Sequence, residues 1–369
     1  MNPKSITVLF LSGGSQVTQF LLTTLVGRRA GMRLVATSSI ADDAGLFGFD
    51  AVYLTPKTAK DPVGFERRME EIIEIEGVDL IVPARDDDVE FLGAWRDRNP
   101  DRAHRAAVGT GEIARVACDK WLSHEYALAR GLPFARSLRH ADTSALQAFI
   151  DEVGFPVLAK PCDGFSSKGI FLLDSIAQME RWLAVGNYVI EEYLGPADDV
   201  RNFREGLVHD GVPLFYMFHG RPRFSAELII GPSGELVGEF CSDNEPQWRS
   251  RYVEHCKDDD GVQLMRQCAQ VFIREGWRGP LNIQAQRDRT GVLRIHEFNG
   301  RLTAPTAERY FMGHDGFAKL VKAFTGFELP ASPWDSHPAP RANSQLSSRA
   351  ADPRQVLTLQ STGQWRAVN

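Results

Sequence analysis

The sequence predicts a mixed α/β and α+β fold built from two or three packed units. Its 369 residues exceed what a single ordinary core holds. Apolar runs alternate with helix-like segments over about the first 110 residues, which is typical of a parallel sheet covered by helices. Turn signals between paired apolar runs follow in the second half, and these are typical of antiparallel sheets.

The first unit, residues 1–110, contains the alternating segments. Apolar residues recur at helical spacing from Phe65 to Ile73, and Gly77 stands where a helix often ends. The predicted strands of this unit are residues 6–11, 33–37, 50–54 and 78–82. This order of elements favours a parallel sheet with helices on both faces.

Two further units are predicted. Residues 111–187 form a small unit in which strands at 155–160 and 169–173 flank a polar turn. Residues 188–328 form a larger unit with antiparallel character. Its predicted elements are hairpins at 207–215 and 227–240, a helix at 262–274 and strands at 281–286 and 292–297.

Residues 329–369 are predicted to be an extended or disordered tail. Prolines from Pro330 to Pro340 break every period of apolar residues. Removal of the tail is therefore expected to leave the melting temperature nearly unchanged. The run Val356–Leu359 is the one part of the tail that suggests docking.

Composition and charge exclude several classes of partner. The 42 basic and 48 acidic side chains give a net charge of −6, which offers no reason to expect nucleic acid or an anionic membrane. The five cysteines form no C-x-x-C pair, and the first apolar run is too short for a signal peptide or a membrane span. A cytoplasmic protein is expected.

The strongest chemical signal is the segment Ile295–Arg301, at the end of a predicted strand. Alternate residues of a strand point to the same face, so Glu297, Asn299 and Arg301 are expected to project together. The carboxylate and amide oxygens suit Mg²⁺, and the guanidinium suits a phosphoryl group. Gln284 on a neighbouring strand would complete the metal ligands. A strand end with a solvated polar face would show the same pattern.

Two lysines precede this segment. Lys160 ends an apolar strand and is expected to point into a cleft. The turn at 163–169 follows it, with glycines for close backbone approach and the hydroxyls of Ser166 and Ser167 as donors to phosphate. Lys120 lies forty residues earlier. Taken alone, each lysine also suits a solvated surface charge, and the turn suits an ordinary hairpin loop.

A strand-like segment at 188–193 ends in Glu191 and Glu192. The backbone here would pair with an adenine edge, and an acid such as Asp198 or Asp199 would bind the ribose hydroxyls. Without the other motifs, this segment is an unremarkable strand exit.

The order of the motifs resembles that of the ATP-grasp superfamily: Asp-Lys, a strand lysine with a Gly/Ser turn, V-I-E-E-Y, N-I-Q and E-x-N-x-R. The chain looks most similar to the branch with the carbamoyl-phosphate synthase large subunit, biotin carboxylase and pyrrolysine-biosynthesis-type ligases. The resemblance covers about residues 5–328, and residues 82–90 look like the acidic loop of a pre-ATP-grasp domain. It implies a Rossmann-like pre-ATP-grasp domain at 1–110, a lid subdomain at 111–187 and a catalytic subdomain at 188–328.

The resemblance also implies a site for ATP and Mg²⁺, with Mn²⁺ as an alternative metal. Lys120 and Lys160 would bind the ATP phosphates, and Arg301 would stabilise the transferring phosphoryl group, so that Lys160 and Arg301 are the implied catalytic residues. The other residues implied for nucleotide binding are Ser166, Ser167, Glu191, Glu192, Leu194 and Asp199. The residues implied for the metal are Gln284, Glu297 and Asn299.

The chain departs from the family pattern in three places. Gly300 replaces the usual proline of E-x-N-P-R, which is expected to loosen the strand exit. The phosphate turn has fewer glycines than most members and contains Phe165 and Lys168. Gln284 stands where many relatives have an acid, a departure with precedent in the carbamoyl-phosphate branch.

The activity implied is that of a ligase that activates a small carboxylate as an acyl phosphate for attack by an amine or a thiol. The turn at 163–169 is expected to close as a lid that excludes water. One alternative is a bicarbonate-activating carboxylase or carbamoyl-phosphate-type enzyme, although the chain has one ATP-grasp unit and no biotin-carrier motif. Another is an ATP-binding regulatory protein with little turnover. A homodimer is compatible with the resemblance.

Overall fold

The computed structural model describes residues 5–140, 142–164, 168–211, 223–246, 251–343 and 349–367. The helices are α1 (Gln16–Thr24), α2 (Pro62–Glu76), α3 (Asp86–Arg98), α4 (Gly111–Cys118), α5 (Lys120–Ala129), α6 (Thr143–Val153), α7 (Ile176–Ala184), α8 (Ala197–His209), α9 (Asp259–Arg274), α10 (Pro305–Phe311), α11 (Gly316–Thr325) and α12 (Pro353–Thr362). The strands are β1 (Ile6–Phe10), β2 (Met32–Ser38), β3 (Ala51–Leu54), β4 (Leu80–Val82), β5 (Ser137–Leu138), β6 (Val157–Pro161), β7 (Phe171–Leu173), β8 (Tyr188–Glu192), β9 (Arg223–Ile230), β10 (Leu236–Pro246), β11 (Arg251–His255), β12 (Gly279–Arg287), β13 (Leu293–Asn299), β14 (Arg341–Asn343) and β15 (Gln364–Arg366).

The N-terminal sheet has the strand order β15-β3-β2-β1-β4, and β1 to β4 run parallel. The predicted parallel sheet is therefore confirmed. Every residue of β1 is buried, as expected for a strand covered by helices on both faces. Helix α2 ends at Gly77 in the left-handed conformation, with φ of 59°.

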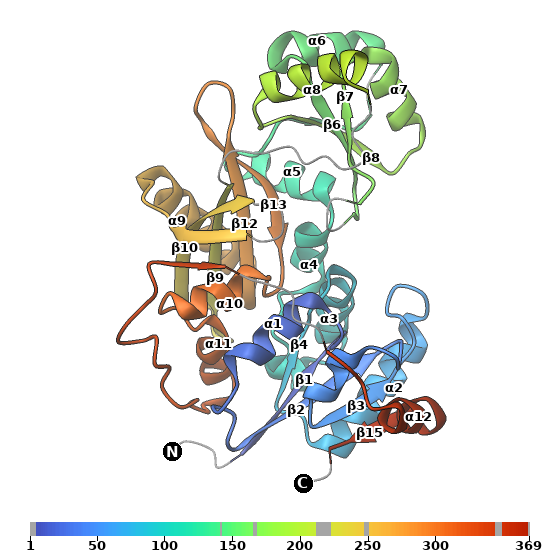
Figure 1. The fold of residues 1–369 in the computed structure, drawn as a ribbon, viewed down its shortest axis with the longest axis vertical. Coiled ribbons are helices and arrows are strands. Elements are labelled where there is room, and N and C mark those ends of the chain that lie inside the picture. The colour runs from blue at the N-terminus through green and yellow to red at the C-terminus, as the bar shows by residue number, and fades with distance from the viewer. Residues whose placement is uncertain are drawn as a thin grey trace.

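A four-stranded antiparallel sheet, β5-β8-β6-β7, forms the part of the molecule at the top of Figure 1 together with α6, α7 and α8. The predicted hairpin at 207–215 is wrong in its first part, because α8 runs through His209. The sequence contains a helical spacing here, in Val200, Phe203 and Leu207. The Asp-Gly pair at 210–211 instead favoured a hairpin turn. Residues 212–215 lie outside the described part of the chain.

The third sheet has six strands in the order β13-β12-β9-β10-β11-β14. The predicted hairpin of β9 and β10 and the antiparallel pair of β12 and β13 are both present. Helices α4 and α5 lie beside β13 in Figure 1, α5 toward the small antiparallel sheet and α4 toward the N-terminal sheet. Residues from segments around all three sheets line one cavity.

The tail is more ordered than the sequence predicts. β14 pairs with β11, and β15 pairs antiparallel with β3 at the edge of the N-terminal sheet. Helix α12 lies beside that edge in Figure 1. Pro353 occupies the first turn of α12, where a proline is tolerated, and therefore helps to start the helix. Leu359 is fully buried, and Trp365 packs edge-on against Phe47.

In the part of the chain that the structure describes, no helix is long and apolar enough to span a membrane.

Candidate active site

A cavity of about 1330 Å³ opens where the three sheets meet. The predicted site residues that line it are Lys120, Lys160, Glu191, Glu192, Leu194, Gln284, Glu297, Asn299 and Arg301. Ser166 and Ser167 lie outside the described residues. Asp199 belongs to α8, and its side chain is outside the described part. The cavity thus brings together residues that are as far as 181 positions apart in the sequence, from Lys120 to Arg301.

The register of β12 and β13 positions the predicted metal ligands. Gln284 lies directly opposite Glu297 on the neighbouring strand, so their side chains share one face. Asn299 is two residues further along β13 and is 5% exposed. Its Oδ1 atom is the one that could bind a metal, whereas Nδ2 is buried and has no hydrogen-bond partner among the described residues.

These three side chains fit a magnesium ion. All offer the hard oxygen donors that Mg²⁺ prefers, and Mg²⁺ in nucleotide sites commonly takes one or two carboxylates and completes its shell with phosphate oxygens and water. Among the described residues there is no cluster of three or more His, Cys, Asp or Glu side chains that would hold a metal. The three predicted ligands are one carboxylate and two amides. They would leave coordination positions on the metal for oxygen atoms of a nucleotide.

Lys160 and Glu191 form a buried ion pair across β6 and β8. Lys160 lies opposite Val189 in the register, so Glu191 is its diagonal neighbour on the same face. Burial raises the pKa of the Glu191 carboxyl, and Lys160 opposes that rise. The ion pair fixes the position of the Lys160 side chain in the cavity lining.

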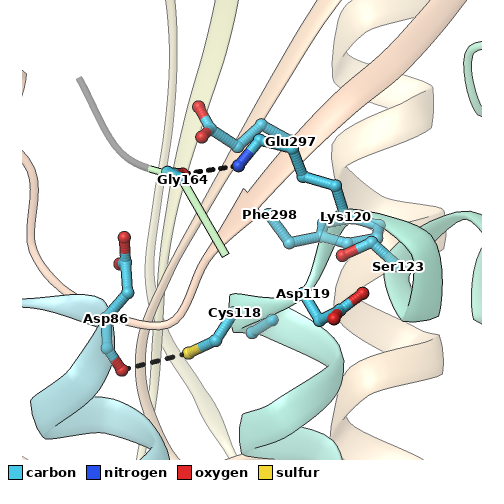
Figure 2. A pocket seen from close by; sticks show the side chains of 9 residues that line it. Asp86, Cys118, Asp119, Lys120, Ser123, Gly164, Glu297 and Phe298 are labelled. Atoms are coloured by element: carbon cyan, nitrogen blue, oxygen red, sulfur yellow. Dashed lines mark hydrogen bonds between the residues drawn. The ribbon is translucent and has the colours of Figure 1, made fainter. Parts of the chain in front are cut away.

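Lys120 lies at the first residue of α5, whose N-cap is Asp119. Its Nζ donates a hydrogen bond to the carbonyl oxygen of Gly164, at 2.5 Å. Figure 2 shows this side chain reaching toward Gly164 beside the carboxylate of Glu297. Lys120, Gly164 and Glu297 also line a pocket of about 10 Å³, which is the size of one water molecule.

Arg301 is held by a residue of the N-terminal unit that the sequence did not predict for the site. Its Nε donates to Oδ1 of Asp86 at 2.8 Å. Asp86 begins α3, immediately after β4. The sequence offered one signal for this contact, the acidic loop at 82–90, but no pattern linked that loop to Arg301. This ion pair links the segment that carries Arg301 to α3 of the N-terminal unit.

Gly300 does not loosen the strand exit as expected. A Cβ atom at this position would lie 2.4 Å from the ring of Trp277 and 2.8 Å from a methyl group of Val89. Trp277 is fully buried, so its ring has little room to move. Gly300 is thus required by close packing, which fixes the segment that carries Arg301.

No protein-family model and no curated protein sequence matches the chain. Solved structures do match. The N5-carboxyaminoimidazole synthetase of Staphylococcus aureus aligns with a TM-score of 0.62 and 14% identity over 89% of this chain and 81% of that one. The biotin carboxylase domain of the Hydrogenobacter thermophilus 2-oxoglutarate carboxylase aligns with a TM-score of 0.63 and 15% identity, over 91% and 72%. The Campylobacter jejuni biotin carboxylase aligns with a TM-score of 0.61 and 15% identity, over 88% and 72%.

The chain has the ATP-grasp fold. The predicted fold class is confirmed, whereas identities of this size carry no information on the substrate.

An ionic cluster joins the small antiparallel sheet of this ATP-grasp chain to the six-stranded sheet. Glu192 accepts a hydrogen bond from the backbone N–H of Arg136 at 2.8 Å and pairs with Arg294 at 3.4 Å. Arg294 also pairs with Asp288 at 2.7 Å. Burial raises the pKa of Glu192. Burial acts in the same direction on Asp288, but hydrogen bonds from Thr290 and Arg294 outweigh it and lower its pKa to about 2.

One further cavity residue was absent from the sequence prediction. His296 lines the cavity, and its Nε2 atom is buried without a partner. Burial, together with the nearby Lys160, lowers the pKa of His296 well below its ordinary value. The imidazole is therefore neutral at pH 7.

Proposed function

We propose that this ATP-grasp protein uses ATP and Mg²⁺ to activate a small carboxylate as an acyl phosphate and passes the acyl group to an amine. The observation that carries the proposal is the convergence of two lysines, one arginine and three oxygen-donor side chains in one cavity of about 1330 Å³. Cations beside hard oxygen donors are what phosphoryl transfer requires, because that reaction depends on positioning and charge neutralisation.

The nucleotide would lie between the small antiparallel sheet and the six-stranded sheet. Lys120 and Lys160 would bind phosphate oxygens, which would compete with their present partners, Gly164 and Glu191. Leu194 is an apolar wall of the same cavity and suits a purine ring. Among the similar structures, the Campylobacter jejuni enzyme was solved as a β-γ-ATP complex.

Gln284, Glu297 and Asn299 would hold Mg²⁺. The ion would supply charge neutralisation at the phosphoryl oxygens. Arg301 would add a second positive group at the transferring phosphoryl, and its pairing with Asp86 fixes the orientation of the guanidinium before substrate arrives.

The proposed chemistry has two steps. A carboxylate oxygen attacks the γ-phosphorus, the bond to the bridging oxygen breaks, and ADP leaves. The amine nitrogen then attacks the carbonyl carbon of the acyl phosphate, inorganic phosphate leaves, and the nitrogen gives up a proton. The cavity continues past Arg301 to residues of the N-terminal unit, including Ser15, Gln16 and Arg85, so both substrates have room beside the nucleotide.

Bicarbonate activation is the second candidate. Two of the similar structures are biotin carboxylases, and the Hydrogenobacter structure contains MgADP and bicarbonate. Under this alternative the acid is bicarbonate and the first product is carboxyphosphate. A third outcome is nucleotide binding with little turnover.

ADP release from purified protein separates these functions. With ATP and Mg²⁺ present, we expect ADP release to depend on one pool of organic carboxylates together with one pool of amines, in buffer stripped of bicarbonate. Release that requires added bicarbonate would favour the carboxylase. If the protein binds ADP but forms none from ATP in any pool, it is a regulatory nucleotide-binding protein, and the ligase proposal is overturned.

A further inference from the structure

Glu227 is a buried carboxylate on an inner strand of the six-stranded sheet. It belongs to β9, which lies between β12 and β10, and it is 1% exposed. Its Oε2 atom accepts hydrogen bonds from Thr306 and, at 3.2 Å, from Arg309, both on α10. Burial would raise the pKa of this carboxyl group, but the neighbouring His314 and Arg309 outweigh burial and lower the pKa. The group is therefore ionised at pH 7 and can only accept hydrogen bonds.

The hydroxyl group of Thr306 connects this carboxylate to the backbone beside the cavity. A hydroxyl has a single hydrogen, and here that hydrogen is donated to Glu227. The oxygen of the same hydroxyl accepts a hydrogen bond from the backbone N–H of Thr303 at 3.1 Å. Thr303 lines the cavity, and Thr306 is buried. The buried charge thus fixes the direction of one peptide N–H in the cavity wall.

The same peptide group contacts the guanidinium of Arg301. Its N–H belongs to Thr303 and its carbonyl to Leu302, and the carbonyl oxygen accepts a hydrogen bond from Nη1 of Arg301 at 3.4 Å. A peptide group is planar, so a fixed N–H direction also fixes the direction of the carbonyl oxygen. Asp86 binds the other guanidinium nitrogens, Nε at 2.8 Å and Nη2 at 3.4 Å. Arg301 is therefore held from two sides, and one of them leads back to Glu227.

We propose that Glu227 and Thr306 are positioning residues that orient Arg301 toward the transferring phosphoryl group. The inference rests on the proposed function, because it requires Arg301 to bind that group. Both side chains are buried, so they act through Arg301 rather than by touching a nucleotide. A role in stability alone makes a different prediction: loss of the Thr306 hydroxyl would destabilise the protein without changing how it recognises a phosphoryl group.

Substitutions of Thr306 separate these roles. Thr306→Val has nearly the same shape and lacks the hydroxyl, whereas Thr306→Ser keeps it. The probes are ADP and AMP-PNP, a non-hydrolysable ATP analogue, titrated by calorimetry with Mg²⁺; the ratio of their affinities measures contacts to the third phosphoryl group. We expect Thr306→Val to weaken AMP-PNP relative to ADP by about threefold to tenfold, as for partial loss of a hydrogen bond to a charged group. Thr306→Ser should keep the wild-type ratio.

Two variants at other positions serve as controls. Arg301→Ala removes the guanidinium and gives the largest change in ratio that this contact can cause. Thr325→Val removes a hydroxyl with the same kind of bonding, at the end of α11. Thr325 donates to the carbonyl of Val321 at 2.7 Å and accepts from the N–H of Phe327 at 3.1 Å. We expect Thr325→Val to lower the melting temperature and to leave the ratio unchanged.

Each other result has a definite meaning. A wild-type ratio in Thr306→Val, while Arg301→Ala changes the ratio, overturns the inference and leaves the proposed function standing. Equal weakening of both nucleotides in Thr306→Val, or the same change of ratio in Thr325→Val, also overturns the inference. If Arg301→Ala keeps the wild-type ratio, the proposed role of Arg301 fails together with the inference. If Thr306→Val does not fold, Thr306→Cys takes its place, because its thiol forms only weak hydrogen bonds and the ratio should change in the same direction.

Discussion

Asp88 is the third residue of α3, and its carboxyl group has no exposed surface. Its Oδ1 accepts hydrogen bonds from Ser12 at 3.2 Å and Thr58 at 3.1 Å, while Oδ2 has no partner among the described residues. Burial, and to a smaller extent the charge of Asp87, raise its pKa from 3.8 to about 7. The folded protein therefore keeps a proton on Asp88 that the unfolded chain releases above about pH 4.

Stability should consequently fall as the pH rises from about 4 through 7, because the unfolded state binds fewer protons over that range. The shift corresponds to about 4 kcal/mol at most. Asp88→Asn is neutral at every pH, so its free energy of unfolding should lack this decline and exceed that of the wild type at pH 8. Urea unfolding at pH 5 and pH 8 measures the difference. Parallel pH profiles for the two proteins would show that Asp88 is ionised in the fold.

The proposed metal ligands allow a second prediction for single residues. Glu297→Gln removes the one charge of the set, and Asn299→Ala removes one amide. Each should raise the Mg²⁺ concentration for half-maximal ADP release by about tenfold or more, since even indirect partners of a metal site cost that much. ADP affinity measured without metal serves as the internal control and should change less. Mg²⁺ titrations that superimpose on those of the wild type would locate the metal elsewhere.

Residue patterns predicted part of this site. Alternation along the strand predicted that Glu297, Asn299 and Arg301 share a face, and all three line the cavity, Arg301 from two residues beyond the end of β13. The same alternation assigns His296 to the opposite face, although it also lines the cavity, because the β-bulge at this point depends on how β12 and β13 pair and leaves no mark in the period of one strand. The contact of Arg301 with Asp86 spans 215 residues and depends on the packing of one unit against another.

At the scale of elements, the tail offers a matched pair of leucines. Leu359 is fully buried on α12, whereas Leu357 of the same helix is 62% exposed. Leu359→Ala should lower the free energy of unfolding by about 2–4 kcal/mol, and Leu357→Ala by about 0.5 kcal/mol or less. Thermal or urea unfolding of the two variants tests whether the tail packs on the N-terminal sheet. If both substitutions lower the free energy of unfolding by the same small amount, the tail does not pack on the sheet.

The tail also shows why its composition did not predict α12 and β15. The prolines from Pro330 to Pro340 suggested an extended tail, but they lie before α12, and Pro353 stands after the cap residue Asp352, where a proline favours a helix start. β15 has three residues and becomes a strand because β3 presents an open edge to it. By contrast, α2 carries a long helical period and the parallel strands are mostly short apolar runs, so the sequence predicted them well.

At the scale of the whole molecule, the site exists only because three sheets meet. The lysines come from α5 and β6, the metal set from β12 and β13, and the acid that holds Arg301 from α3. The order of motifs was enough to predict this fold, since most of the motifs end a strand or begin a helix, and N-I-Q lies within β12. The substrate could not be predicted, because the part of the cavity proposed for it is lined by residues such as Ser15, Gln16 and Arg85, whose types occur on any surface.

The acyl phosphate is the central claim, and hydroxylamine tests it most directly because it replaces the unknown amine. With ATP, Mg²⁺ and pooled organic acids, the wild-type protein should form a hydroxamate in one pool, together with an equal amount of ADP. Lys160→Met should remain folded and reduce the rate about 100-fold, in line with the loss of a positioned charge worth about 3 kcal/mol in the transition state. ADP binding without hydroxamate in any pool, or an undiminished rate in Lys160→Met, would contradict the account.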